Sequence, residues 1–347
     1  MVKRLMILFL LFMLAAAIAS ADLSIHFLDV GQGDAVICTC DGKVMMIDGG
    51  RPESSQMIYS YLRDLGIEKI DIMVLTHPHS DHVGGLSAAL SACDTGIIYT
   101  PIYYYNDPAF LRFRDMAAER NLPFVMPLSG TSFSFGDARV TVLAPYKLFG
   151  DTNDNSLVLR IAYGTHTFLF TGDAEVPEEQ EILGSGAEIA STVLKVGHHG
   201  SGSSSSEAFL KAVHPKIALI GVGPGNTYGH PALDVLSRLR DLGSEIYRTD
   251  LHGTVILTSD GKNLEITTER QPTGEEDVYT LSWAMLTGAA EEEHPPAEYY
   301  VGNVKSQKFH LPECEGALKM SEKNKMVFDT REEAIAAGYQ PCGTCHP

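Results

Sequence analysis

The segment His77-Pro78-His79-Ser80-Asp81-His82 brings three imidazoles and a carboxylate within six positions. It follows an apolar run, residues 70–75, that predicts a buried strand, and Gly84-Gly85 comes directly after it. In an extended loop, His77 and His79 point the same way because side chains alternate with period two. The carboxylate and the last imidazole then face a second position. Such a loop can supply ligands to a pair of divalent cations, as metal-assisted hydrolysis requires. A histidine-rich surface loop is the alternative.

The motif H-x-H-x-D-H at the end of a strand resembles the metallo-β-lactamase superfamily. Further segments are similar, in the same order, to the hydrolase domain of ComEC-type competence proteins, which act in DNA uptake. They are Phe27-Leu28-Asp29-Val30-Gly31-Gln32-Gly33-Asp34-Ala35, Asn155-Ser156-Leu157-Val158-Leu159, Phe170-Thr171-Gly172-Asp173, Leu194-Lys195-Val196-Gly197-His198-His199-Gly200-Ser201 and Asn226-Thr227-Tyr228-Gly229-His230-Pro231. The resemblance covers roughly residues 22–270. It implies an α/β fold, the αβ/βα metallo-β-lactamase sandwich, with its site at the edge of the strands.

The resemblance also assigns the ligands of the cation pair. His77 and His79 would bind the first cation, and Asp81 and His82 the second. Asp173 matches the carboxylate that bridges both cations. Because Asp173 comes just after an expected buried strand, its oxygen atoms would lie at the sheet edge. An ordinary turn aspartate is the alternative for this residue.

Two later segments would complete the site. His198 or His199 would be the last ligand of the second cation; we expect His198, although adjacent imidazoles leave both assignments open. His230, in a loop that contains Gly and Pro, would lie over the metals to hold a phosphate oxygen or protonate a leaving group. A surface histidine is the alternative for His230. Asp81, His199 and His230 are therefore the residues that we expect to contribute to catalysis.

The superfamily usually supplies a third histidine to the first cation just before the bridging aspartate. Residues 151–155, with the sequence DTNDN, stand at this place and contain no histidine. A side-chain oxygen of Asn153 or Asn155 is the candidate ligand instead. Oxygen donors suit Mn²⁺ better than an all-imidazole site does, so both Zn²⁺ and Mn²⁺ remain candidates.

Three further aspartates are expected to support the ligands from behind. Asp48 matches a family position that would orient a ligand imidazole, with an ordinary Asp-Gly turn as the alternative. Asp29 and Asp34 flank the loop Gly31-Gln32-Gly33 and would serve similarly. The glycines of this loop would let the backbone approach the site.

The first residues predict a targeting signal. Lys3-Arg4 supply positive charge, residues 5–18 are an unbroken apolar run, and Ala19-Ser20-Ala21 is a cleavage site of small residues. We expect residues 1–21 to be a cleaved signal peptide and the chain to be secreted or extracytoplasmic, with no stable membrane span after cleavage. An uncleaved N-terminal membrane anchor is the alternative.

The C-terminal part predicts a second metal site. Residues 271–297 hold six acidic residues and no Lys or Arg, which indicates a linker. In the small unit 298–347, His310 and Cys314 are separated by three residues, and Cys342 and Cys345 by two. This four-ligand pattern is typical of a structural Zn²⁺ site. It resembles the zinc-binding module of Ada-type DNA repair proteins. Disulfide bonds are the alternative in an oxidising compartment.

The remaining pattern alternates strand-like and helix-like segments, which favours sheets covered by helices. Expected strands are residues 23–28, 35–40, 43–47, 70–75, 140–143, 156–162, 166–170, 191–196 and 216–222; expected helices are residues 56–65, 205–213 and 231–242. The run Tyr103-Tyr104-Tyr105 and Phe110 are candidates for stacking on a base, with an ordinary packing edge as the alternative.

Composition and motifs together predict an exported dinuclear metallohydrolase. The formal charge of −18 argues against loose electrostatic binding of nucleic acid, although bound cations reverse the field locally. The resemblance to ComEC-type hydrolase domains implies cleavage of phosphodiesters, with DNA as the substrate partner. The alternatives are a hydrolase of another bond, such as a phosphorylcholine ester, a lactone or a β-lactam, and a non-catalytic nucleic-acid-binding protein.

Overall fold

The computed structural model describes residues 22–272, 299–312, 314–330, 333–334 and 337–341. The chain divides into two compact units, residues 1–283 and 284–347. The expected signal peptide, most of the expected linker, Cys342 and Cys345 lie outside the described residues.

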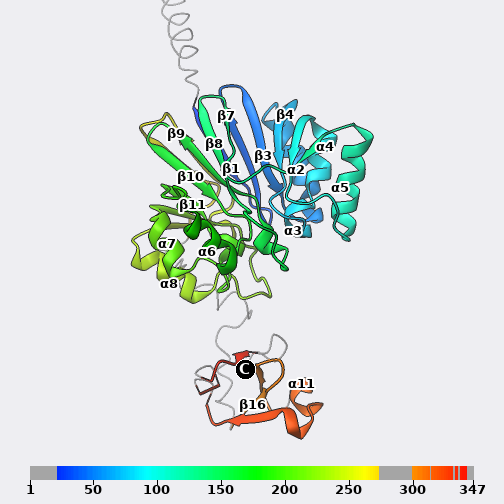
Figure 1. Ribbon diagram of the computed structural model, residues 1–347, viewed down its shortest axis with the longest axis vertical. Helices are drawn as coiled ribbons and strands as arrows, with labels where there is room; N and C mark the ends of the chain where they lie inside the picture. Colours follow the sequence, from blue (N-terminus) through cyan, green and yellow to red (C-terminus); the bar gives the residue numbers. More distant parts are fainter. Residues whose placement is uncertain (1–21, 273–298, 313, 331–332, 335–336, 342–347) are drawn as a thin grey trace, which may run out of the picture. The chain divides into compact units, whose positions relative to one another are not determined.

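Two mixed sheets form the first unit (Figure 1). The eight-stranded sheet has the order β15-β14-β1-β2-β3-β4-β5-β6, and the seven-stranded sheet has the order β13-β12-β11-β10-β9-β8-β7. Their strands are β1 (Leu23–Phe27), β2 (Ala35–Cys40), β3 (Lys43–Gly49), β4 (Lys69–Val74), β5 (Asp94–Tyr99), β6 (Phe124–Val125), β7 (Ser132–Phe135), β8 (Ala138–Ala144), β9 (Val158–Tyr163), β10 (His166–Phe170), β11 (Val193–Lys195), β12 (Ile217–Ile220), β13 (Glu245–Arg248), β14 (Val255–Ser259) and β15 (Leu264–Thr268).

Helices cover the outer face of each sheet (Figure 1). Apolar residues of α2, α4 and α5 share a buried cluster with the eight-stranded sheet, and those of α6, α7 and α8 share one with the seven-stranded sheet. The helices of the first unit are η1 (Pro52–Ser54), α2 (Ser55–Asp64), α3 (Ser80–Val83), α4 (Leu86–Ala92), α5 (Pro108–Glu119), η2 (Asn153–Asn155), α6 (Val176–Ser185), η3 (Gly197–Gly200), α7 (Glu207–Val213), α8 (Leu233–Asp241) and α9 (Thr249–His252). Within the described part of the chain, no helix combines the length and the apolarity that crossing a membrane requires.

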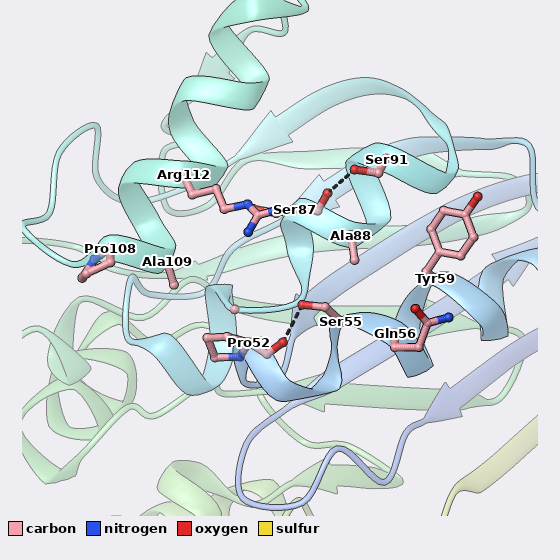
Figure 2. Close-up of a pocket in the computed structure, with 11 residues that line it drawn as sticks. Pro52, Ser55, Gln56, Tyr59, Ser87, Ala88, Ser91, Pro108, Ala109 and Arg112 are labelled. Atoms are coloured by element: carbon pink, nitrogen blue, oxygen red, sulfur yellow. Dashed lines mark hydrogen bonds between the residues drawn. The ribbon is translucent and has the colours of Figure 1, made fainter.

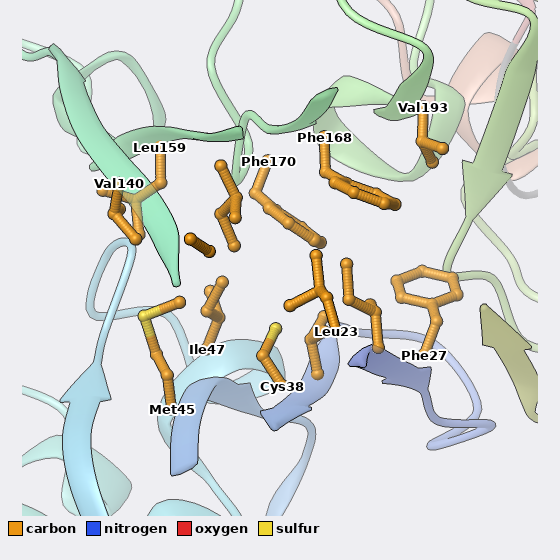
Figure 3. Close-up of a cluster of buried hydrophobic side chains, with 14 of the residues drawn as sticks. Leu23, Phe27, Cys38, Met45, Ile47, Val140, Leu159, Phe168, Phe170 and Val193 are labelled. Atoms are coloured by element: carbon orange, nitrogen blue, oxygen red, sulfur yellow. The ribbon is translucent and has the colours of Figure 1, made fainter. Parts of the chain in front are cut away.

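The main core lies between the two sheets (Figure 3). In β1 the burial alternates along the strand, because successive side chains point to opposite faces of a sheet. Leu23 and Phe27 of this strand pack in one cluster with Phe168 and Phe170 of β10 and with the fully buried Cys38. The αβ/βα sandwich expected from the sequence is confirmed.

Each sheet contains a run of parallel strands, and these runs position the site. Strands β3 to β6 pair in parallel, and so do β10 to β13. In open sheets of this type, ligands bind outside the carboxyl ends of the parallel strands. The histidine segment follows β4, Asp173 follows β10 and the pair His198-His199 follows β11. All three therefore belong to loops at strand carboxyl ends.

The second unit is a small sheet with little core. Its strands β16 (Tyr300–Asn303), β17 (Lys308–His310), β18 (Lys325–Phe328) and β19 (Gln340–Pro341) have the order β18-β16-β17-β19. Short helices α11 (Glu315–Leu318) and η4 (Glu322–Asn324) join them. A few aromatic side chains, including Phe309 and Phe328, form the buried cluster. A unit of this size usually needs a metal or disulfide to fold.

Candidate metal centre

The histidine segment turns from β4 into the short helix α3. His77 is fully buried and His79 is partly buried, and His77 Nε2 lies 3.1 Å from His79 Nδ1. Asp81 and His82 lie within α3, where His82 is also fully buried. The short loop therefore presents two imidazoles before the helix and a carboxylate and an imidazole within it.

Asp173 is the centre of the site. Its carboxylate, 2% exposed, lies 3.2 Å from His82 Nε2 and 3.4 Å from His199 Nε2. His77 Nε2 is 3.7 Å from the same carboxylate. Both sheets supply residues to this site, because His77 and His82 follow β4, and Asp173 and His199 follow β10 and β11.

Buried nitrogen atoms without hydrogen bonds test whether a cation fits here. Among the described residues, His82 Nε2 and His199 Nε2 are buried and have no hydrogen-bond partner. Asp34, His82, Asp173 and His199 each offer a donor atom, and these atoms lie within 4.8 Å of one another. Asp81 Oδ2 lies 3.3 Å from His199 Nε2. Imidazole and carboxylate donors grouped in this way fit a divalent cation such as Zn²⁺ or Mn²⁺.

The protonation states follow from burial and from the crowding of charges. Burial, followed by the neighbouring His82, holds the pKa of His77 well below its usual value, so its imidazole is neutral and ready to bind a metal. Burial would lower the pKa of His82, but the carboxylates of Asp173 and Asp48 outweigh it and raise this pKa to about 10. A cation that binds His82 must displace a proton, so the cation affinity should rise with pH.

Lys195 is a buried cation that the sequence analysis did not assign to the site. Its ammonium group forms an ion pair with Asp34, donates a hydrogen bond to the carbonyl oxygen of Gly172 at 2.6 Å and lies 3.4 Å from Asp173 Oδ1. Burial lowers its pKa, but the carboxylates of Asp34 and Asp173 outweigh it and raise this pKa. Lys195 therefore fixes one side of the central carboxylate.

Of the three aspartates expected behind the ligands, Asp48 lies behind His82 and Asp34 lies within the donor group. Asp48 accepts hydrogen bonds from the backbone N–H and the hydroxyl of Thr76, at 2.8 and 2.7 Å, and lies 2.8 Å from His82 Nδ1. This contact sets the direction of the His82 ring. Asp34 lies within the donor group itself, bound to Lys195. The structure differs for Asp29, whose carboxylate pairs with Arg270 away from the pocket.

Gly33 explains how the loop before β2 reaches the site. Its φ of +143° is unfavourable for other residues, and a Cβ atom there would collide with the carbonyl oxygen of Asp81. The next residue, Asp34, donates its backbone N–H to that same oxygen at 3.2 Å. The close approach places the Asp34 carboxylate beside Lys195.

Of the adjacent histidines, the one that joins the donor group is His199, whereas we expected His198. His199 is the one whose Nε2 joins the donor group, while its Nδ1 lies 2.8 Å from the carbonyl oxygen of Gly221. His198, expected as the ligand, is 23% exposed, with Nδ1 2.9 Å from Glu175 and Nε2 3.8 Å from Asp173. Both residues have positive φ, 47° and 55°, a local geometry that residue identity did not predict.

His230 lies beside the pair in the pocket. Its ring is 5.4 Å from that of His198 and 6.4 Å from that of His199. Burial, followed by the charge of His199, lowers the pKa of His230 to about 3. Its imidazole is therefore neutral at physiological pH and can donate one N–H to an oxygen atom.

The asparagine segment contributes one residue to the pocket. Asn153 lines it, and the buried Asn153 Oδ1 has no hydrogen-bond partner among the described residues. Asn155 instead ties its own loop together, accepting from the Phe149 N–H at 2.7 Å and donating to the Asp151 carbonyl oxygen at 2.7 Å. Of the two candidates, only Asn153 lines the cavity and has a side-chain oxygen without a hydrogen bond among the described residues.

A cavity of about 300 Å³ opens over these groups. It is lined by Gln32, His79, Ser80, Asp81, Tyr105, Asp107, Asn153, Asp173, His198, His199, Tyr228 and His230. A larger hollow of about 420 Å³ lies between α2, α4 and α5 (Figure 2). None of the described residues that line this larger hollow is His, Cys, Asp or Glu, so it offers no metal-binding side chain of these types.

The second unit brings together half of its expected ligand set. Cys314 Sγ lies 3.4 Å from His310 Nδ1, and both side chains are buried. Cys314 is free of any disulfide to the described cysteines. The other two expected ligands, Cys342 and Cys345, lie outside the described residues.

Comparison with known proteins agrees with this geometry. Residues 28–223 match the metallo-beta-lactamase superfamily, and residues 288–347 match the metal binding domain of Ada. The chain is 29% identical over 268 residues to ComE operon protein 3 of Bacillus subtilis and 33% identical over 242 residues to competence protein ComA of Neisseria gonorrhoeae. It is also 31% identical over 245 residues to recombination protein 2 of Haemophilus influenzae.

These alignments cover 72%, 69% and 69% of this chain, but only 34%, 33% and 29% of the three relatives. The chain thus spans about a third of the length of the curated relatives that it matches. The match to the superfamily runs through the histidine segment, Asp173 and His198-His199, the same loops that converge in the structure. The chain belongs to the metallo-beta-lactamase superfamily, as a metal-dependent hydrolase related to competence proteins, and carries a C-terminal metal binding domain of the Ada type.

Proposed function

We propose that the chain hydrolyses phosphodiesters with two divalent cations and that its substrate is DNA. One observation carries the proposal: imidazoles from the loop after β4 and from the loop after β11 meet around a single buried carboxylate, Asp173. His77, His79 and Asn153 would hold one cation. Asp81, His82 and His199 would hold the other. Asp173 would bridge them.

Divalent cations at these positions would activate water and neutralise the charge that develops on phosphate oxygens. The residues of the chain then have separate tasks. Asp48 keeps the His82 ring in one orientation, and Lys195 does the same for Asp173. His230, as a neutral imidazole, donates its N–H to a phosphate oxygen. His198, bound to Glu175, faces the cavity as a second group that contacts substrate.

The choice of a phosphodiester rests on the relatives and on the cavity. The named relatives are competence and recombination proteins, and this relation suggests nucleic acid as the substrate class. The cavity is lined mostly by polar side chains, including four histidines and Tyr228, which offer hydrogen-bond donors to oxygen atoms. A lactone, a β-lactam or a phosphorylcholine ester remains the alternative bond, and a non-catalytic nucleic-acid-binding protein the alternative class.

A substrate panel tests the proposal. We expect the purified chain with Mn²⁺ or Zn²⁺ to cleave plasmid DNA and bis-p-nitrophenyl phosphate, and to leave nitrocefin unchanged. DNA and the small diester left intact under both metals would refute a phosphodiesterase. Loss of DNA binding without loss of small-diester turnover, after residues 298–347 are removed, would show that the C-terminal unit serves binding and not catalysis.

We also infer the organisation of the chain outside the described residues. Residues 1–21 are a signal peptide that exports the protein, residues 271–297 are a linker, and residues 298–347 hold one structural Zn²⁺ through His310, Cys314, Cys342 and Cys345. The support is the charge and small-residue pattern of the first residues and the ligand spacing of the last. N-terminal sequencing of the protein recovered from its native host should begin near Asp22, and an intact Met1 would overturn the cleavage.

A further inference from the structure

We propose that a second, largely apolar pocket beside the metal centre binds the base of a nucleotide, and that single-stranded nucleic acid is therefore the preferred substrate. This inference rests on the proposed function, because it places the neighbouring phosphate at the cation site. The pocket has a volume of about 350 Å³. It is distinct from the metal cavity, since none of its lining residues lines that cavity.

The same three loops line both pockets. Pro78 lines the apolar pocket, while the next residue, His79, lines the metal cavity. In the same way, Tyr103 lines the apolar pocket and Tyr105 lines the metal cavity. In a third segment, Thr152 lines the apolar pocket and Asn153 lines the metal cavity. Three separate segments thus contribute neighbouring residues to both pockets, so the apolar pocket lies beside the metal cavity and can receive a group attached to a phosphate held there.

The pocket wall suits a flat, weakly polar group. Tyr103 is 54% exposed, and Leu148 is 72% exposed, so large apolar surfaces face solvent beside the site. Phe149 adds a second aromatic ring, and the Lys147 ammonium group lies 4.9 Å from the centre of that ring. The Asn155 side chain holds the Phe149 backbone through both its N–H and its carbonyl oxygen. These two bonds hold the backbone segment that carries the Phe149 ring.

Charge explains why the base and not the backbone should carry the affinity. The chain has a formal charge of −18, and no Lys or Arg lines either pocket in the described part of the chain. Binding through many phosphates needs such cations. Stacking of bases on aromatic side chains tolerates sequence variation and needs no net positive charge. In a duplex the bases are paired and stacked within the helix, so only a single strand can place a base in this pocket.

The experiment compares two oligonucleotides of equal length and charge. One is a fluorescent dT 12-mer, and the other has the same phosphates but abasic sugars. We measure their binding by anisotropy in EDTA, and cleavage of single-stranded and duplex DNA with Mn²⁺. The wild-type chain is expected to bind the dT oligonucleotide about tenfold more tightly than the abasic one, the effect of one stacked base. The variant Tyr103→Ala should lose this difference, and Tyr103→Phe should keep it.

Tyr104 provides the matched control. It belongs to the same run, is 59% exposed and lines neither pocket. Tyr104→Ala should bind both oligonucleotides as the wild type does. Equal binding of the two oligonucleotides by the wild type, or a Tyr103→Ala variant that still discriminates, would overturn the inference. So would cleavage of duplex DNA as efficient as that of a single strand.

A small diester separates this inference from the proposed function. Bis-p-nitrophenyl phosphate has no base, so Tyr103→Ala should hydrolyse it at the wild-type rate. If the wild type binds dT through Tyr103 but hydrolyses no diester, the base pocket stands and the proposed function falls. If the wild type hydrolyses the diester but shows no preference for dT, the proposed function stands and the base pocket falls.

Discussion

Replacing Asp173 with asparagine is expected to lower phosphodiester turnover by more than about a hundredfold. Groups that only support a metal ligand already cost about 10- to 100-fold when they are removed, and Asp173 contacts the imidazoles of both loops directly. His82 Nε2 and His199 Nε2 lie 3.2 and 3.4 Å from its two oxygen atoms. Asparagine keeps the shape and removes the charge, so initial rates on bis-p-nitrophenyl phosphate at saturating Mn²⁺ report the loss of the carboxylate that we propose to bridge the cations.

Asp48→Asn is the matched variant, because it changes the same functional group one step further from the cations. Asp48 lies 2.8 Å from His82 Nδ1 but is not itself one of the four donor residues. Its expected loss is about 10- to 100-fold, smaller than that of Asp173→Asn. Near-UV circular dichroism would show whether both variants keep the native packing. Equal activity of Asp173→Asn and wild type would show that turnover does not need the Asp173 carboxylate.

Replacing Lys195 with methionine is expected to destabilise the metal-free protein by about 3–5 kcal/mol, the usual cost of leaving a buried charge without its partner. The Lys195 side chain is 2% exposed, and its ammonium group pairs with Asp34 and lies 3.4 Å from Asp173. Without the ammonium group, both carboxylates remain buried with less positive charge beside them. Urea denaturation in EDTA measures the change in the free energy of unfolding.

A double variant isolates the charge from the packing. Lys195→Met combined with Asp34→Asn removes both members of the ion pair, so it should be more stable than Lys195→Met alone. Saturating Mn²⁺ should also recover part of the loss, because cations would take over the compensation of Asp173 and because a ligand of the folded state stabilises that state. An unchanged free energy of unfolding for Lys195→Met in EDTA would contradict the structural role of this ammonium group.

Much of the fold follows from local pattern. The expected strands at 35–40 and 166–170 match β2 and β10, and the expected helix at 56–65 is shifted by one residue from α2. Helix α5 was not predicted, although its signals are in the sequence: Asp107 caps it, Pro108 begins it, and Phe110 is one of its buried residues. Strand β9 begins later than expected because Ser156 and Leu157 bond to the site loops instead.

The site was predictable where the residue types are unusual and unpredictable where the backbone decides. Three imidazoles and a carboxylate in six positions have few other uses, so the sequence alone predicts that this loop binds metal. The choice between His198 and His199 depends on two successive positive φ angles, which residue identity does not fix. The sequence does contain a signal for Lys195. A charged residue within an apolar strand is rarely buried without a partner, which indicates a nearby carboxylate.

Metal analysis of the full chain by inductively coupled plasma mass spectrometry tests most directly whether one pocket holds a pair of cations. The comparison is between the wild type and the combined variant His77→Ala, Asp173→Asn and His199→Ala, both loaded with Mn²⁺ or Zn²⁺ and then desalted. The wild type should retain two more ions per chain than the variant, while any ion of the C-terminal unit cancels in the difference. An equal metal content in the two proteins would contradict the account.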